Sequence, residues 1–159
     1  MTATETIVVG IDGSPTGLRA LQWALGEATR TGATVRAIHA WLFTPYDVPS
    51  VTTVADARQH AERTLATTIN AALAEAVDPP RVDSEAVEGY PPRVLVEASA
   101  EAALLVVGTH GHGPLVNALL GSVSTECVRH AACPVVVVPP PRKPLRHPNR
   151  TEMLSAPLY

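Results

Sequence analysis

The chain has 159 residues, of which 46% are hydrophobic and 17% are charged. This length suits one domain that buries a core without a metal or a disulfide, and this composition excludes a disordered chain. The net charge of −3 argues against a general nucleic-acid binder, which is usually basic. The single lysine, Lys143, does not stand in a glycine-rich turn, so a P-loop ATPase is also excluded.

The sequence predicts a cytoplasmic protein. No stretch of about 18 apolar residues occurs, which is the length that a membrane-spanning helix needs. The apolar run Ile7–Val9 is too short for the core of a signal peptide. We therefore expect Cys127 and Cys133 to remain reduced. We expect no metal bound through them, because no second Cys or His pair stands at ligand spacing.

Apolar runs and helical patterns alternate along the chain. In chain order we predict a strand at Thr6–Ile11, a helix at Pro15–Thr31, a strand at Thr34–His39, a helix at Thr52–Val77, a strand at Arg81–Val87, a helix at Pro92–Ala102, a strand at Leu104–Val107, a helix at Ser122–Ala131 and a strand at Pro134–Val138. Ser14 is the expected N-cap of the first helix, and Gly32 is its expected C-terminal stop. Strict alternation predicts right-handed crossovers and an open parallel sheet.

The composition of the strands indicates where each one lies in the sheet. Four of them are continuously apolar, which is typical of a parallel sheet with helices on both faces. Arg81–Val87 instead alternates polar and apolar residues, so we expect it at an edge or half-exposed. The predicted fold class is therefore α/β, with a five-stranded sheet in the middle of three layers.

Two segments do not fit this alternation. Trp41–Val51 is a predicted loop. From Pro139 to Tyr159 the chain has four basic residues and one acidic residue, and its prolines favour an extended conformation. We therefore divide the chain into a domain at residues 1–140 and a basic, proline-rich tail at residues 141–159.

The residues after the first strand are candidates for a binding site, because ligands bind beyond the carboxyl ends of the strands in open parallel sheets. Asp12 stands in the segment Gly10–Pro15, directly after that strand. Its carboxylate could bind a ribose hydroxyl or a metal ion held by phosphates, or it could close an Asx-turn into the helix. The residues alone do not separate these interpretations. His39, at the end of the second strand, is expected to be a hydrogen-bonded histidine of the core or the crevice.

A glycine-rich segment, Gly108–Pro114, follows the fourth strand. Its three glycines let the backbone approach a ligand closely. The last helix then opens with Gly121–Ser124, and no acidic residue precedes Glu126. The free N–H groups of such a helix start suit a phosphate. The simpler interpretation is a flexible loop followed by an N-cap.

The joint spacing of these residues is more specific than each part. Gly108-x2-Gly111-x9-Gly121-Ser122, between a buried strand and the final helix, resembles the nucleotide motif of the universal stress protein family. Ile7–Pro15 is similar to that family's opening strand and acidic turn, and Leu104–Pro139 is similar to its C-terminal signature. The resemblance implies an adenine nucleotide alpha hydrolase-like fold with the strand order 3-2-1-4-5.

The glycine motif is intact here, as in the ATP-binding members of the family, so the resemblance implies that the chain binds ATP, which Mg²⁺ could accompany. By position, the ribose would meet Asp12, the adenine would meet Ile11 and Ala40, the ribose side would be lined by Val107 and Gly108, and the phosphates would be held by Gly111, Gly121, Ser122, Val123 and Ser124. A bulky side chain at Gly108 or Gly111 would then keep the backbone away from the nucleotide. No catalytic residue and no protein metal site is expected.

The favoured function is a nucleotide-dependent stress-response module with little or no catalysis and an unknown regulatory protein partner. A slow ATPase or nucleotidyl-transfer enzyme is the alternative, although no Lys or Arg lies between Arg93 and Arg129 to stabilise a leaving phosphate. A structural dimer with an empty pocket is a third hypothesis. A Rossmann dehydrogenase is excluded, because no G-x-G-x-x-G motif follows the first strand.

The last strand predicts a homodimer. It contains Val135, Val136, Val137 and Val138 between two prolines. Relatives that resemble this chain dimerise through this strand, which lies at the edge of the family's sheet. An apolar edge without charge aggregates unless it is covered, so we expect two copies to pair there. A buried central strand is the alternative. We expect neither nucleic acid nor membrane as a partner.

Overall fold

The computed structural model describes residues 5–43, 53–109 and 120–141. Strands and helices alternate within these ranges, in the order β1 (Thr6–Gly10), α1 (Pro15–Thr31), β2 (Thr34–Trp41), α2 (Val54–Ala74), β3 (Val82–Glu88), α3 (Pro91–Ser99), β4 (Leu104–Gly108), α4 (Ser122–His130) and β5 (Val135–Val138). This confirms the predicted alternation, and every bound lies within three residues of its predicted place. The predicted tail stays a prediction, since residues 142–159 lie outside the described ranges.

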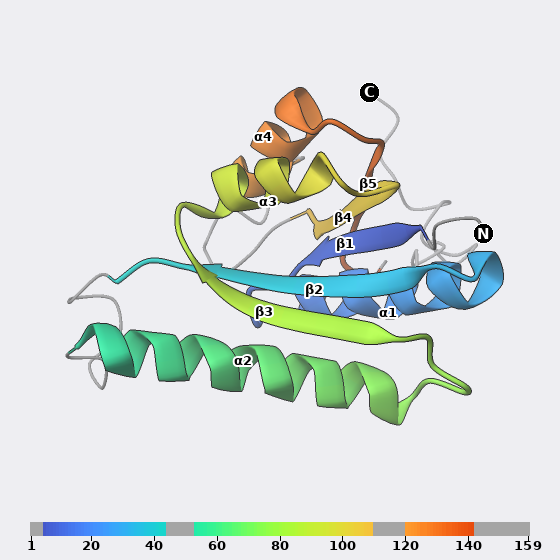
Figure 1. Ribbon diagram of the computed structural model, residues 1–159, viewed down its shortest axis with the longest axis horizontal. Helices are drawn as coiled ribbons and strands as arrows, with labels where there is room; N and C mark the ends of the chain where they lie inside the picture. Colours follow the sequence, from blue (N-terminus) through green and yellow to red (C-terminus); the bar gives the residue numbers. More distant parts are fainter. Residues whose placement is uncertain (1–4, 44–52, 110–119, 142–159) are drawn as a thin grey trace, which may run out of the picture.

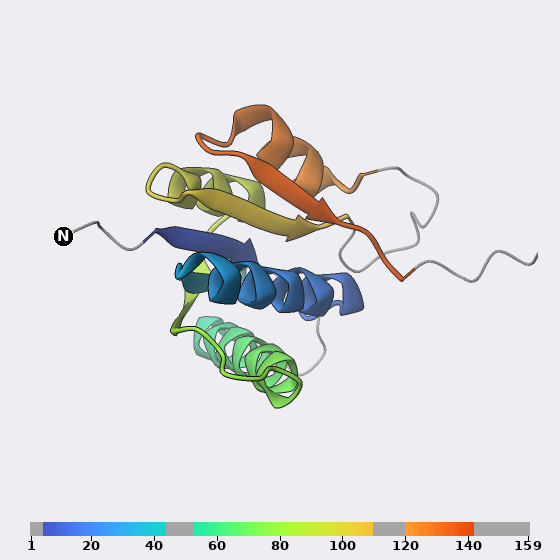
Figure 2. The same cartoon turned by 90° about the vertical axis from the view of Figure 1, so that its right-hand side faces the viewer.

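The five strands form one parallel sheet in the order β3-β2-β1-β4-β5. Helices α1 and α2 cover one face, and α3 and α4 cover the other (Figures 1 and 2). The predicted three-layer α/β fold and its strand order are therefore confirmed. The position of β3 explains its alternation of polar and apolar residues, because β3 is an edge strand with several exposed side chains.

Each face of the sheet carries its own apolar cluster. Because successive side chains of a strand point to opposite faces, Val9 packs with Leu21 of α1, whereas Val8 packs with Leu95 of α3. All four side chains are buried. Strands covered in this way carry mainly apolar residues, as β1 and β4 do. The expectation of a continuously apolar strand is wrong for β2, which includes Arg36, paired with Glu85 of the edge strand β3.

The ends of the helices follow from capping. The N–H of Gly17 donates to the hydroxyl of Ser14 (3.1 Å), and Gly32 closes α1 in the left-handed conformation at φ 74°. Both caps of α1 were predicted. The predicted end of α2 at Val77 is wrong by three residues. Val77 is 91% exposed, so the apolar pattern there has no core to pack against.

Strand β5 lies at the other edge, which overturns the alternative of a central strand. Val136 packs toward the α1 cluster and Val137 toward the α3–α4 cluster, so neither valine simply faces outward. The open side of β5 is its backbone. The carbonyls of Pro134 and Val138 accept hydrogen bonds from Leu105 and Thr109 (both 3.0 Å). The backbone groups of Val135 and Val137 therefore point to the open edge, because successive residues of a strand alternate.

Candidate functional site

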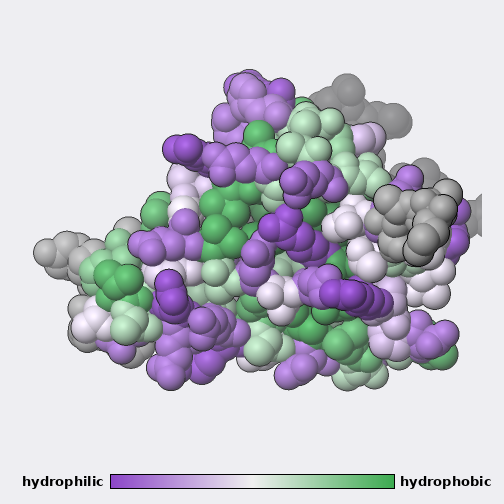
Figure 3. Space-filling model, viewed as in Figure 1, coloured by the Kyte–Doolittle hydropathy of each residue, from purple (hydrophilic) through white to green (hydrophobic). Residues whose placement is uncertain are grey.

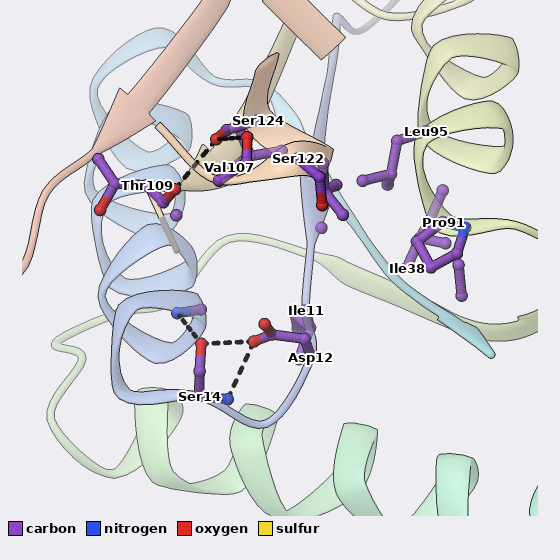
Figure 4. Close-up of a pocket in the computed structure, with 16 residues that line it drawn as sticks. Ile11, Asp12, Ser14, Ile38, Pro91, Leu95, Val107, Thr109, Ser122 and Ser124 are labelled. Carbon is purple, nitrogen blue, oxygen red and sulfur yellow. Dashed lines mark hydrogen bonds between the residues drawn. The ribbon is translucent and has the colours of Figure 1, made fainter. Parts of the chain in front are cut away.

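The chain leaves β1 toward one face of the sheet and leaves β4 toward the other. These neighbouring strands end at the same edge, since all strands are parallel. Because the helices that follow them, α1 and α4, lie on opposite faces of the sheet, a crevice is left at the point where the strand order reverses. A pocket of about 320 Å³ opens there (Figure 4).

Nine of the ten residues predicted for the site line this pocket: Ile11, Asp12, Ala40, Val107, Gly108, Gly121, Ser122, Val123 and Ser124. They come from the ends of β1, β2 and β4 and from the start of α4. The tenth, Gly111, lies outside the described residues. The structure thus brings together positions more than 100 residues apart in sequence, and their contact with a ligand stays a prediction.

The sequence analysis missed an apolar wall of the pocket, formed by Ile38, Pro91 and Leu95 (Figure 4). A signal for each was present. Ile38 stands two residues before Ala40, so both side chains point to the same face of β2. Pro91 and Leu95 are four residues apart at the start of α3 and therefore share one side of that helix.

Asp12 both closes a turn and lines the pocket. Its Oδ1 accepts hydrogen bonds from the N–H (2.9 Å) and the hydroxyl (2.5 Å) of Ser14. The Asx-turn interpretation is therefore confirmed, and the same bonds hold the carboxylate in place (Figure 4). Asp12 is the one charged side chain among the described residues that line the pocket.

Thr109 fastens the start of α4 to the end of β4. Its carbonyl accepts hydrogen bonds from the N–H of Gly121 (2.6 Å) and from the hydroxyl of Ser124 (3.0 Å). No acidic residue stands in the first turn of α4. This helix start therefore presents backbone N–H groups and the positive end of the helix dipole to the pocket.

The two glycines at this end of the pocket, Gly108 and Gly121, differ in how strongly the structure requires a glycine there. A Cβ on Gly108 would lie 2.9 Å from the hydroxyl oxygen of Thr16 and 3.0 Å from its Cβ. Close packing of β4 on α1 therefore explains this glycine, and the expectation that it also keeps the backbone open to a ligand stays a prediction. Gly121 has φ −73° and ψ 171°, which any residue can adopt. Its lack of a side chain is therefore not a requirement of the backbone.

A second hollow of about 660 Å³ lies between α3 and the β2–β3 half of the sheet. Figure 3 shows apolar surface there between hydrophilic side chains. Arg36 pairs with Glu85, and Arg93 pairs with Glu97 (2.8 Å), so much of this charge is balanced within the hollow. The two hollows meet at Ile38, which lines both.

The part of the chain that the structure describes has neither a metal-binding cluster nor a membrane-spanning helix. No group of three or more His, Cys, Asp or Glu side chains there could hold a metal ion. None of the helices is long and apolar enough to cross a membrane.

The sheet order and the pocket at its switch point define an open α/β protein that can hold a small ligand between two βα units. The sequence model of the universal stress protein family matches residues 3–139. The chain belongs to the universal stress protein family, and the resemblance noted in the sequence is confirmed.

Relatives and solved structures agree with this assignment. A universal stress protein of Mycobacterium tuberculosis is 40% identical over 132 residues, which are 82% of this chain and 44% of that protein. One from Mycolicibacterium smegmatis is 34% identical over 134 residues, 84% of this chain and 45% of that protein. The chain therefore spans about half the length of the curated relatives it matches.

Two solved structures are informative. A universal stress protein crystallised in complex with cAMP is 30% identical, covers 86% of this chain and 98% of its own, and superposes with a TM-score of 0.65. UspA from Lactobacillus plantarum is 23% identical, with coverages of 86% and 99% and a TM-score of 0.70. The second likeness shows the fold alone.

The contrast between two glycines of the fold is testable. Gly108→Ala should lower the free energy of unfolding by about 1–3 kcal/mol, because the new Cβ forces β4 away from Thr16. Gly26→Ala, in the open middle of α1 with nothing within 4 Å, should raise it by about 0.5–1 kcal/mol. Urea unfolding measures both. Equal effects of the two substitutions would contradict the packing role of Gly108.

Proposed function

We propose that this chain is a regulatory module that binds an adenine nucleotide, with ATP as its ligand, and performs little or no catalysis. The observation that carries the proposal is the gathering of nine predicted site residues around one pocket at the strand ends. Its volume lies at the lower end of the range of small-molecule sites. The cAMP complex of a relative that is 30% identical supports an adenine nucleotide.

The proposed pose follows the polarity of the pocket. The adenine packs against the apolar wall of Ile38, Pro91 and Leu95, next to Ile11 and Ala40. Val107 and Gly108 lie beside the ribose, and the carboxylate of Asp12 accepts from a ribose hydroxyl.

The phosphates lie at the start of α4, where Ser122, Val123 and Ser124 offer backbone N–H groups and no acidic residue repels them. Gly121 lies beside them and contributes space rather than a donor, because its own N–H is bound to the carbonyl of Thr109. Gly111 would complete this cradle. Mg²⁺ would enter with the phosphates, and Asp12 is the one carboxylate that the described lining offers.

The setting of this function is part of the proposal. We propose that the chain acts in the cytoplasm, where a regulatory protein distinguishes the nucleotide-bound chain from the nucleotide-free chain.

Nucleotide binding is the first test. Calorimetry with ATP and Mg²⁺ on the nucleotide-stripped chain should show one saturable site. Gly121→Val should weaken ATP binding by about tenfold or more (~1.4 kcal/mol), because its side chain enters phosphate space while its backbone stays favourable. Gly26→Val, outside the pocket, is the control. Absence of binding at millimolar ATP would contradict the proposal, and normal binding by Gly121→Val would contradict the phosphate position.

Turnover separates the proposal from the slow ATPase or nucleotidyl transferase. Among the described residues that line the pocket there is no Lys or Arg, whereas phosphoryl transfer relies on cations around the transferred group. We expect phosphate release from ATP well below about 1 s⁻¹, the low end for kinases. Steady release at that rate or faster, abolished in Asp12→Asn, would favour the enzyme instead.

We also propose that two copies pair through β5. This edge presents the backbone of Val135 and Val137, and the strand carries no charge that would prevent pairing. Two such strands meeting antiparallel would satisfy both edges and give a closed two-fold dimer.

The dimer is testable at Val137. Val137→Pro removes an N–H that points to the open edge and leaves the bonds to β4 intact, so the dimer should dissociate. Val137→Thr keeps that N–H and the branched side chain, and it should remain dimeric. Sedimentation at micromolar concentration measures both. A monomeric unmodified chain would refute the interface.

A further inference from the structure

The backbone of Ile11 is fastened to β2 on both sides. Its N–H donates to the carbonyl of Ile38 (2.8 Å), and its carbonyl accepts from Nδ1 of His39 (2.8 Å). Strand β1 ends one residue earlier, at Gly10. The carbonyl of Ile11 therefore accepts its hydrogen bond from a side chain of β2 and not from a backbone N–H of that strand. Ile11 is only 4% exposed, which leaves its carbonyl little access to water.

The chemistry of this bond fixes the state of His39. A carbonyl oxygen only accepts, so the proton must be on Nδ1. Burial lowers the pKa of the imidazole, and the neutral ring therefore prevails at neutral pH. Among the described residues, the charged and titratable groups that act on it are Asp12, from the turn after β1, and His60, from α2.

The next residue in the chain is Asp12, whose carboxylate is held from the other side by Ser14. Two anchors therefore define the turn, the Asx bonds to Ser14 and the bond from His39 to Ile11. His39 does not itself line the pocket. The geometry points to His39 as a positioning residue: by holding the Ile11 carbonyl, it aims the Asp12 carboxylate at the ribose hydroxyls. This inference rests on the proposed nucleotide site.

A pair of substitutions isolates the bond. His39→Leu removes the donor at similar volume, whereas His39→Asn places an amide N–H near the position of Nδ1. The ligands are AMP and 2′,3′-dideoxy-AMP, which lacks the hydroxyls that Asp12 would meet. Calorimetry on the full chain gives the ratio of the two affinities. His60→Leu, at an exposed position of α2, controls for the loss of an imidazole nearby.

The unmodified chain, His60→Leu and His39→Asn should prefer AMP by about tenfold, the value of one well-placed hydrogen bond. In His39→Leu the preference should fall to about twofold or less, while dideoxy-AMP binds as before. Urea unfolding checks that each variant is folded. If the His39→Leu variant is not folded, His39→Thr is used in its place. Threonine is one bond shorter than leucine, and its β-branched side chain suits a strand.

The outcomes separate this inference from the proposed function. If the unmodified chain binds neither ligand, the nucleotide site itself is wrong. If it binds AMP with preference and His39→Leu keeps that preference, the nucleotide site stands and the role of His39 is overturned. Equal loss of preference in His39→Asn and His39→Leu also overturns it, because the donated hydrogen bond would then not be the cause.

Discussion

The divergence of two parallel strands is the constraint on which the pocket depends. Strands β1 and β4 are neighbours, yet the chain leaves β1 for the α1–α2 face and β4 for the α3–α4 face. Within the described residues this divergence leaves a hollow between Asp12 and the start of α4. Backbone groups that α4 cannot satisfy within itself face that hollow, and their chemistry suits an anion.

Local chemistry explains why so much of the fold was predictable. Apolar runs indicate buried strands, and apolar residues at helical spacing indicate helices with one buried face. Caps such as Ser14 and Gly32 mark helix ends. Predictions were less accurate where the local pattern and the tertiary packing disagree. Apolar residues continue past the end of α2, but Val77 meets no core. Strand β2 continues to Trp41, which packs against Ala57 and Ala61 of α2. The local sequence pattern does not predict this tertiary contact.

The candidate site was predictable to a similar extent and for a related reason. Residues that follow strands could be named because a parallel sheet brings its carboxyl ends together. The wall of Pro91 and Leu95 was missed because it depends on how α3 packs over β1 and β2. Gly108 was interpreted as an opening for a ligand, which stays a prediction, and its close packing against Thr16 was not foreseen. The bond from His39 to Ile11 likewise joins two strands and is visible only once their register is known.

Thr109 connects the two features proposed for this chain. Its carbonyl holds Gly121 and Ser124 at the start of α4, where the phosphates would bind. Its N–H donates to the carbonyl of Val138 (3.0 Å), the last residue of the edge strand. Thr109 itself is 8% exposed, so these bonds are largely shielded from water. A shift of α4 when a ligand arrives would therefore act on the same residue that holds the end of β5, and the proposed pocket and the proposed dimer edge share one hydrogen-bonded junction.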